Sequence, residues 1–307
     1  MKRFLAGLAL AGILLFVWYW YREPLDALEP ADPQAQLVGF REERREGRKR
    51  LFATLATERL GEVSIVVDLP EPLPARERLP VVLVLGGLAG GERNIGWITA
   101  PGPNAIVGYD WPVPTAMPQG MELAARFLDV RAAALSIPGQ LATALLWLRA
   151  QPWADGERVS MLGFSLGALA APAAQRVAAA AGMKVGWTVL AYGGAPLGEL
   201  VAANPFLKPD WARPLLQVAT DVVLRPGEPS LHLPHLAGRF LVLEGREDAF
   251  VPPPAAARYR NLTPEPKTIV AFDGGHMGVG PRQLELLEKI IRASRAWLAE
   301  EKAIDLE

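Results

Sequence analysis

One segment, Val159–Ala170, constrains the fold of this chain more than any other. It contains Gly163-Phe164-Ser165-Leu166-Gly167, with an apolar stretch typical of a strand before it and an alanine-rich stretch typical of a helix after it. Glycine lacks a Cβ, so the strand and the helix can approach closely around the serine. A serine at such a corner sits on a strained turn that exposes its hydroxyl. The pattern predicts that Ser165 is a nucleophile, with a chance match among abundant glycine and alanine as the alternative.

The N-terminus carries an uncharged run of eighteen residues, Phe4 to Tyr21, directly after Lys2 and Arg3. This length suffices for a helix to cross a bilayer, and the aromatic residues at its end are typical of a membrane interface. A cleaved signal peptide is the alternative, but it would have a shorter apolar region and a cleavage site between small residues. We therefore expect residues 1–21 to form an uncleaved transmembrane anchor. The leading basic pair predicts an extracytoplasmic catalytic domain, periplasmic in a bacterium.

The rest of the chain is long enough for one large domain. The sequence has 307 residues, a formal net charge of −1 and no cysteine. Disulfides, thiolate zinc sites and a cysteine nucleophile are therefore excluded. The near-neutral charge and the absence of a basic cluster around aromatic residues argue against a nucleic-acid partner. We divide the chain into the anchor, a proline-containing linker over residues 22–37 and a catalytic domain over residues 38–303.

The order of expected elements predicts an α/β fold. Residues 38–69 contain extended stretches separated by glycine, which indicates antiparallel hairpins. From residue 80 onward apolar strands alternate with helices, a pattern typical of a mostly parallel central sheet with helices on both faces. The expected strands are residues 81–85, 105–109, 159–164, 185–192, 240–244 and 267–272, and the expected helices include residues 140–151 and 283–301.

Residues 195–237 interrupt this alternation. They contain seven prolines and no clear strand. An insertion of this length in a compact domain is typical of a lid over a functional site. His232 and His235 lie within it, but Pro234 disfavours the helix that would bring them together and no third metal ligand is evident. We interpret them as surface or loop histidines.

A serine nucleophile needs a base, and the base needs an orienting acid. His276 follows the last expected strand, at the sheet edge where functional loops of parallel sheets gather. Asp248 follows the strand at residues 240–244 at the same edge, with Glu247 as a close competitor and Asp273 as a residue that could bond its own turn. The sequence thus predicts a Ser165, Asp248, His276 order, which differs from the trypsin and subtilisin orders.

With these motifs in this order, residues 50–300 resemble the α/β-hydrolase superfamily. The matching segments are residues 163–167, residues 245–252 and Gly274-Gly275-His276. The resemblance implies the α/β-hydrolase fold, with Ser165 as nucleophile, His276 as base and Asp248 as its orienting acid. It also implies an oxyanion hole formed by the backbone N–H of Leu166 and one in the loop after the strand at residues 81–85, assigned to Leu88.

The resemblance is nearest to esterases and to dienelactone-hydrolase-like or acyl-thioester-active members. It implies a serine hydrolase that cleaves an ester, thioester or amide of a small-molecule or lipid-like acyl group through an acyl-enzyme, without a metal or organic cofactor. Gly86-Gly87 stands where many relatives have His-Gly, which leaves the substrate class open. Two alternatives remain: an acyltransferase whose lid excludes water, and a non-catalytic interaction protein whose insertion is a docking surface. The sequence does not indicate an oligomeric state.

Overall fold

The structure, a computed structural model, describes residues 2–45, 47–73, 78–87, 90–112, 125–278 and 283–306, with side chains described from residue 11 onward except at residue 283. Its strands are β1 Gln36–Arg45, β2 Arg48–Ala56, β3 Glu62–Pro70, β4 Leu79–Leu85, β5 Ala105–Tyr109, β6 Ala154–Phe164, β7 Trp187–Ala191, β8 Arg239–Gly245 and β9 Lys267–Phe272. Its α-helices are α1 Lys2–Tyr21, α2 Gly91–Ile95, α4 Phe127–Arg149, α5 Leu166–Ala180, α6 Leu197–Ala203, α7 Arg213–Val223, α8 Pro229–His232, α9 Pro253–Leu262 and α10 Gln283–Glu300.

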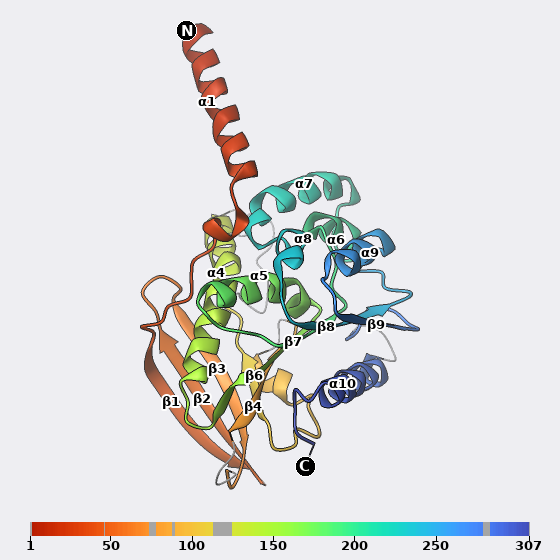
Figure 1. Ribbon diagram of the computed structural model, residues 1–307. Coiled ribbons are helices and arrows are strands. Elements are labelled where there is room, and N and C mark those ends of the chain that lie inside the picture. The colour runs from red at the N-terminus through yellow and green to blue at the C-terminus, as the bar shows by residue number, and fades with distance from the viewer. Residues whose placement is uncertain are drawn as a thin grey trace.

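The described strands form one mixed sheet in the order β1-β2-β3-β5-β4-β6-β7-β8-β9. The pairs β1–β2, β2–β3 and β3–β5 are antiparallel, and every pair from β5 to β9 is parallel. Helices cover both faces of the sheet (Figure 1). The predicted antiparallel N-terminal strands and the mostly parallel remainder are therefore confirmed.

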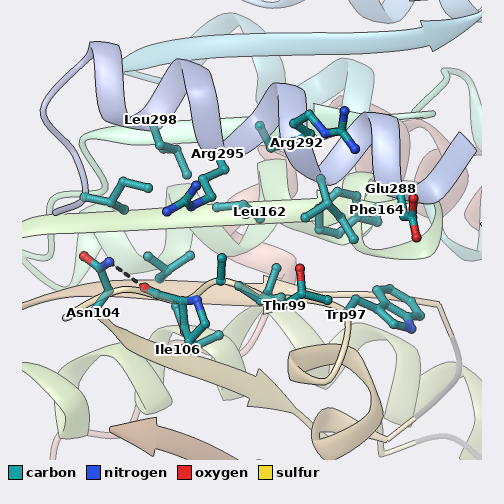
Figure 2. Close-up of a pocket in the computed structure, with 17 residues that line it drawn as sticks. Trp97, Thr99, Asn104, Ile106, Leu162, Phe164, Glu288, Arg292, Arg295 and Leu298 are labelled. Atoms are coloured by element: carbon teal, nitrogen blue, oxygen red, sulfur yellow. Dashed lines mark hydrogen bonds between the residues drawn. The ribbon is translucent and has the colours of Figure 1, made fainter. Parts of the chain in front are cut away.

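Alternation along β4 divides the core between the two faces of the sheet. Val82 and Val84 belong to the cluster that α10 covers, together with Ile290 and Leu298 of that helix. Between α10 and the segment after α2, a groove of about 410 Å³ remains, lined by residues such as Trp97 of this segment and the side chains of α10 (Figure 2).

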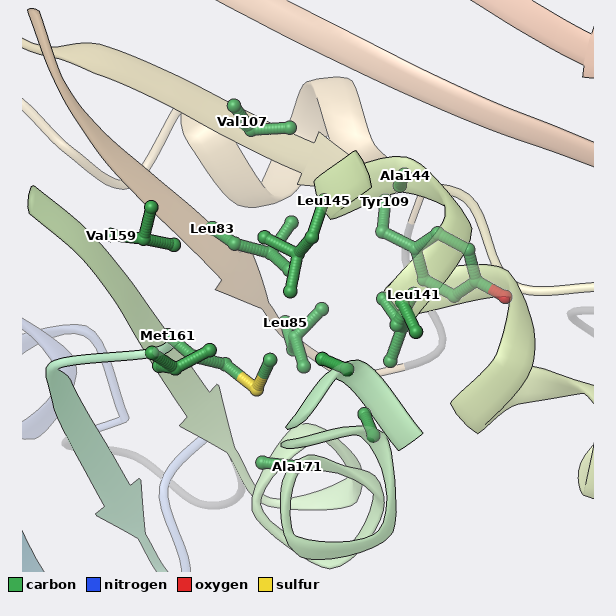
Figure 3. Packing of buried hydrophobic residues seen from close by; sticks show 14 of the residues in the cluster. Leu83, Leu85, Val107, Tyr109, Leu141, Ala144, Leu145, Val159, Met161 and Ala171 are labelled. Atoms are coloured by element: carbon green, nitrogen blue, oxygen red, sulfur yellow. The ribbon is translucent and has the colours of Figure 1, made fainter. Parts of the chain in front are cut away.

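The opposite face of the sheet carries the larger core cluster. Leu83 and Leu85 point to this side, where they pack with Leu141 and Leu145 of α4 and with alanines of α5 such as Ala171 (Figure 3). Side chains of successive strand residues point to opposite faces, so Leu83 and Leu85 share this face of the sheet. The small alanine side chains let α5 lie close to it. This close packing fixes the first turn of α5, which follows Ser165 directly.

Helix α4 begins at Phe127, well before the predicted start at Gln140. Pro138 lies inside it, although proline removes a backbone hydrogen bond from a helix. Long-range contacts hold the part of the helix before Gln140: Nε of Arg131 donates a 3.1 Å hydrogen bond to the carbonyl oxygen of Val223, and Ile137 is buried in the core. A local pattern does not contain such contacts, and it placed the helix start too late.

The N-terminal run forms the expected helix, α1, which extends away from the body of the molecule (Figure 1). Across the part of the chain that the structure describes, no helix meets the length and apolarity needed to cross a membrane. The predicted linker over residues 22–37 packs on the body, with Leu28 and Ala31 buried and the N–H of Asp32 bonded to Oγ1 of Thr143 at 2.8 Å.

The insertion over residues 195–237 is helical. It contains α6, α7, α8 and short 3-10 turns, and the described residues include no strand there, as expected. In Figure 1 α6 and α7 lie beyond the end of the sheet from which α5 starts. The insertion therefore covers the edge of the sheet where Ser165 lies.

Candidate active site

Ser165 lies at the junction of β6 and α5 with φ 53° and ψ −113°. A positive φ is strained for a residue with a side chain, and such strain is concentrated at functional sites. The N–H of Ser165 donates a 2.9 Å hydrogen bond to the carbonyl oxygen of Ala191, which ties the turn to the neighbouring strand β7. A Cβ on Gly163 would lie 2.6 Å from the carbonyl oxygen of Gly167, and one on Gly167 would lie 2.7 Å from Cβ of Leu85. Close packing thus requires both glycines.

The structure brings Ser165, His276 and Asp248 together. Oγ of Ser165 lies 2.8 Å from Nε2 of His276, and Nδ1 of the same ring lies 2.7 Å from Oδ2 of Asp248. The side chains of His276 and Asp248 are 9% and 2% exposed. With the proton of the neutral ring on Nδ1, the imidazole donates to the carboxylate and accepts from the serine hydroxyl. This is the arrangement that lets a histidine take a serine proton.

Backbone donors fix the carboxylate. Oδ1 of Asp248 accepts hydrogen bonds from the N–H groups of Phe250 at 2.8 Å and Val251 at 3.2 Å. The competing acids lie elsewhere: Glu247 is exposed, and Asp273 is exposed and pairs with an arginine. Among these three acids, the hydrogen bond to the imidazole belongs to Asp248.

Two aromatic rings flank His276. The ring of Tyr192 lies edge-on at 5.6 Å and that of Phe250 is tilted at 5.0 Å between centroids. Burial, helped by the negative charge of Asp248, raises the pKa of Tyr192 well above its usual value, so its ring stays neutral. Sequence reasoning missed Tyr192; the one signal was its position directly after a strand at the functional edge of the sheet.

Of the two predicted oxyanion-hole donors, the structure describes one. Leu166 is the first residue of α5, so its N–H has no acceptor within the helix. Leu88 lies outside the described residues, and its neighbour Gly87 accepts a 2.6 Å hydrogen bond from Nε1 of Trp111. A Cβ on Gly86 would overlap the side chain of Asn94, so close packing accounts for glycine at that position.

A cavity of about 380 Å³ opens beside Ser165 and His276. Its walls come from α4, α5 and the insertion, and polar side chains such as Asn204 and Thr220 are few. The apolar lining includes Leu135, Ile137, Leu169, Leu197, Leu200, Val201, Leu224 and Val251. Such a cavity suits an apolar group attached to a reacting carbonyl. The larger groove under α10 contacts neither Ser165 nor His276, although Phe164 lines it.

The prediction that both histidines of the insertion are surface or loop residues is wrong for His232. This side chain is fully buried, and Nε2 donates a 2.7 Å hydrogen bond to the carbonyl oxygen of Pro226. Burial lowers the pKa of His232 to about 4. The cause is the packing of α8 against α5, which no local pattern revealed. His235 is exposed, and the described residues hold no group of three or more His, Asp or Glu side chains placed to bind a metal.

No protein-family model matches the chain, and no curated protein matches its sequence. Several solved structures are similar to it in fold. Acetyl xylan esterase 1 from Thermoanaerobacterium sp. JW/SL YS485 is 18% identical with a TM-score of 0.61, covering 90% of this chain and 93% of its own. An acetyl xylan esterase from Paenibacillus sp. R4 is 16% identical with a TM-score of 0.63, covering 91% and 93%.

An S-formylglutathione hydrolase from Agrobacterium tumefaciens is 18% identical with a TM-score of 0.54, covering 86% of this chain and 99% of its own. At these identities the similarity establishes the fold rather than the substrate. Together with the mixed sheet, these comparisons show that the chain has the α/β-hydrolase fold, which it shares with esterases over about nine tenths of its length.

Proposed function

We propose that this protein is a serine hydrolase that cleaves a carboxylic ester, thioester or amide, with an ester as the leading candidate. The observation that carries the proposal is the unbroken set of hydrogen bonds from Ser165 through His276 to Asp248, beside an apolar cavity. The ester and thioester hydrolases among the similar structures support the same reaction class.

In the first half of this mechanism, Oγ of Ser165 attacks the substrate carbonyl carbon while Nε2 of His276 takes its proton. The negative charge that develops on the carbonyl oxygen is stabilised by the N–H of Leu166. The bond to the leaving group then breaks, and His276 returns the proton to the leaving oxygen, sulfur or nitrogen. Asp248 holds the imidazole in orientation and stabilises its positive charge throughout.

In the second half, water attacks the acyl carbon and gives a proton to His276. The bond to Ser165 breaks, the serine oxygen regains that proton, and a carboxylic acid leaves. An acceptor alcohol in place of water would give an ester, which is the acyltransferase alternative. Analysis of the products formed from an ester with and without an added alcohol separates these two outcomes.

A fluorophosphonate probe tests the nucleophile without a choice of substrate. We expect the full-length protein to be labelled and Ser165→Ala to be unlabelled while its far-ultraviolet circular dichroism is unchanged. Labelling that persists in Ser165→Ala would assign the nucleophile to another residue. Absence of labelling in the folded unsubstituted protein would favour the non-catalytic alternative.

The membrane anchor and the extracytoplasmic location stay predictions. They depend on the apolar run after Lys2 and Arg3 and on the rule that basic residues favour the cytoplasmic side. A topology reporter fused to the C-terminus and active outside the cytoplasm would support the location, and activity only inside it would reverse the prediction. Recovery of a protein that begins near residue 30 would show that the segment is a cleaved signal.

A further inference from the structure

Helix α7 separates the cavity from the outside of the molecule. Thr220 and Leu224, at its C-terminal end, line the cavity. Trp211, Leu215 and Val218 are between 63% and 74% exposed. Leu215 and Val218 lie three residues apart in α7 and therefore on one side of it, and Trp211 lies in the 3-10 turn Asp210–Ala212 directly before the helix. The insertion thus has an apolar inner face and an apolar outer stripe.

The outer stripe leads to the base of α1. One turn beyond Val218, the carbonyl oxygen of Val222 accepts a 2.5 Å hydrogen bond from the hydroxyl of Tyr19. The guanidinium of Arg225 lies 5.4 Å from the ring centroid of Trp20 and donates a 3.2 Å bond to the carbonyl oxygen of Arg22. In Figure 1, α7 lies at the end of the body from which α1 projects. The two apolar surfaces are therefore neighbours joined by direct contacts.

The exposure of α1 indicates what kind of partner covers it. Ile13, Leu14, Leu15 and Phe16 are each more than half exposed. Four successive helical residues, about 100° apart, point in all directions around the axis. A protein partner would cover one stripe, whereas a helix that is apolar all round suits a lipid environment. The helix then ends in a Trp and Tyr cluster, the residues that favour the interface between lipid and water.

From this continuity we propose that α1 and the outer stripe (Trp211 of the preceding 3-10 turn, with Leu215 and Val218 of α7) contact the same lipid phase. The cavity beneath α7 then opens next to that surface, and its acyl substrate arrives from the lipid phase. The statement about the substrate depends on the proposed hydrolase function, and the statement about lipid contact does not. The alternative occupant of the stripe, a second copy of the chain, is an outcome of the test below.

Because the chain has no cysteine, a single introduced thiol can carry a fluorophore at one chosen position. We would label Leu215→Cys and Val218→Cys in the full chain, reconstituted in phosphatidylcholine vesicles with or without a nitroxide-bearing phosphatidylcholine. The matched control is Leu284→Cys in α10, where the leucine is 71% exposed. We expect strong quenching by the nitroxide lipid at positions 215 and 218 and little at position 284.

Equal quenching at the three positions, or none at positions 215 and 218, would overturn the proposal. A second copy would be indicated instead if energy transfer between differently labelled Val218→Cys chains persisted when the vesicles were diluted with excess lipid. In that case the stripe is a contact between chains, and the proposal is again overturned. None of these measurements depends on catalysis.

The substrate statement is tested with the double variant Leu215→Lys and Val218→Lys, matched by Leu284→Lys. For an ester dissolved in the vesicles, we expect KM to rise several-fold in the double variant alone. For a water-soluble short-chain ester, kcat/KM should stay unchanged in both variants, since none of the three positions lines the cavity. An equal loss on both esters would refute the lipid route. If neither ester is hydrolysed by the unsubstituted protein, the proposed function fails while the quenching result still stands.

Discussion

Asp248 and His276 follow the neighbouring strands β8 and β9, and a 2.7 Å hydrogen bond joins Oδ2 of the carboxylate to Nδ1 of the imidazole. The other oxygen of Asp248 accepts from two backbone N–H groups, so the carboxylate cannot rotate away from the ring without losing three hydrogen bonds. Position and tautomer of His276 are therefore both fixed by one residue.

Asp248→Asn should lower kcat by about 10⁴-fold, as loss of the orienting carboxylate does in the serine-protease triad. The amide would present N–H groups where the carboxylate accepts a hydrogen bond from Nδ1, and the imidazole would then hold the wrong tautomer. The rate of hydrolysis of a soluble chromogenic ester measures the effect. Glu247→Gln is the control: this side chain is exposed, and the variant should retain its turnover. If the two variants exchanged these results, the acid would be Glu247.

The backbone of Ser165 predicts that glycine at this position is more stable than alanine. A residue with a Cβ at φ 53° and ψ −113° carries strain of about 1–3 kcal/mol, which glycine relieves. Glycine also makes the unfolded chain more flexible, at a cost of about 0.4–1 kcal/mol. Ser165→Gly should therefore have a free energy of unfolding about 1 kcal/mol above that of Ser165→Ala, measured in urea. Equal stability of the two variants would show that the strain is no larger than this entropic cost.

Gly167 offers a test of the close contact between α5 and β4. A Cβ there would lie 2.7 Å from Cβ of Leu85, and still closer to backbone atoms of the same residue. Gly167→Ala should lower the free energy of unfolding by about 1–3 kcal/mol, because a buried strand must shift. Gly186→Ala is the control, since the nearest atom to a Cβ there lies 3.9 Å away. Similar losses in both variants would mean that the contact at Gly167 is not the cause.

Local pattern was sufficient to place Ser165, His276 and the loop that contains Asp248 at one edge of the sheet. Each follows a strand of a parallel sheet, and the carboxyl ends of such strands meet at one edge, so spacing along the chain translates into proximity in space. Pattern could not decide between Asp248 and Glu247, which are adjacent in sequence. That choice depends on the backbone donors of Phe250 and Val251, which exist only once the loop is folded.

Long-range packing explains what the sequence did not predict. The part of α4 before Gln140 contacts residues distant in the sequence, as in the bond from Arg131 to the carbonyl oxygen of Val223. The helices of the insertion are short and begin at prolines, such as Pro196 at the N-cap of α6 and Pro214 in the first turn of α7. The N-terminus of α6 also depends on a bond from the N–H of Gly198 to Asp221 in α7. The burial of His232 likewise follows from helix packing that no local pattern records.

His232 gives the folded protein a pH dependence below neutrality. Its pKa is about 4 when folded because burial disfavours the charged ring, whereas an unfolded histidine has a pKa of about 6.5. Between these values the unfolded chain binds a proton that the folded chain does not, so the free energy of unfolding rises with pH through this window. Above about pH 6.5 neither state is protonated, and the contribution to stability is complete.

Between pH 7 and pH 4, His232 should therefore lower the free energy of unfolding by up to about 3 kcal/mol, as measured by urea unfolding. His232→Gln keeps an N–H group for the carbonyl oxygen of Pro226 but does not titrate, so the slope between pH 4 and 6.5 should become smaller. His235→Gln is the matched control, because that side chain is exposed on the neighbouring turn, and it should keep the slope of the unsubstituted protein. If His232→Gln also kept the full slope, the acid sensitivity would come from other groups, since glutamine binds no proton in this pH range.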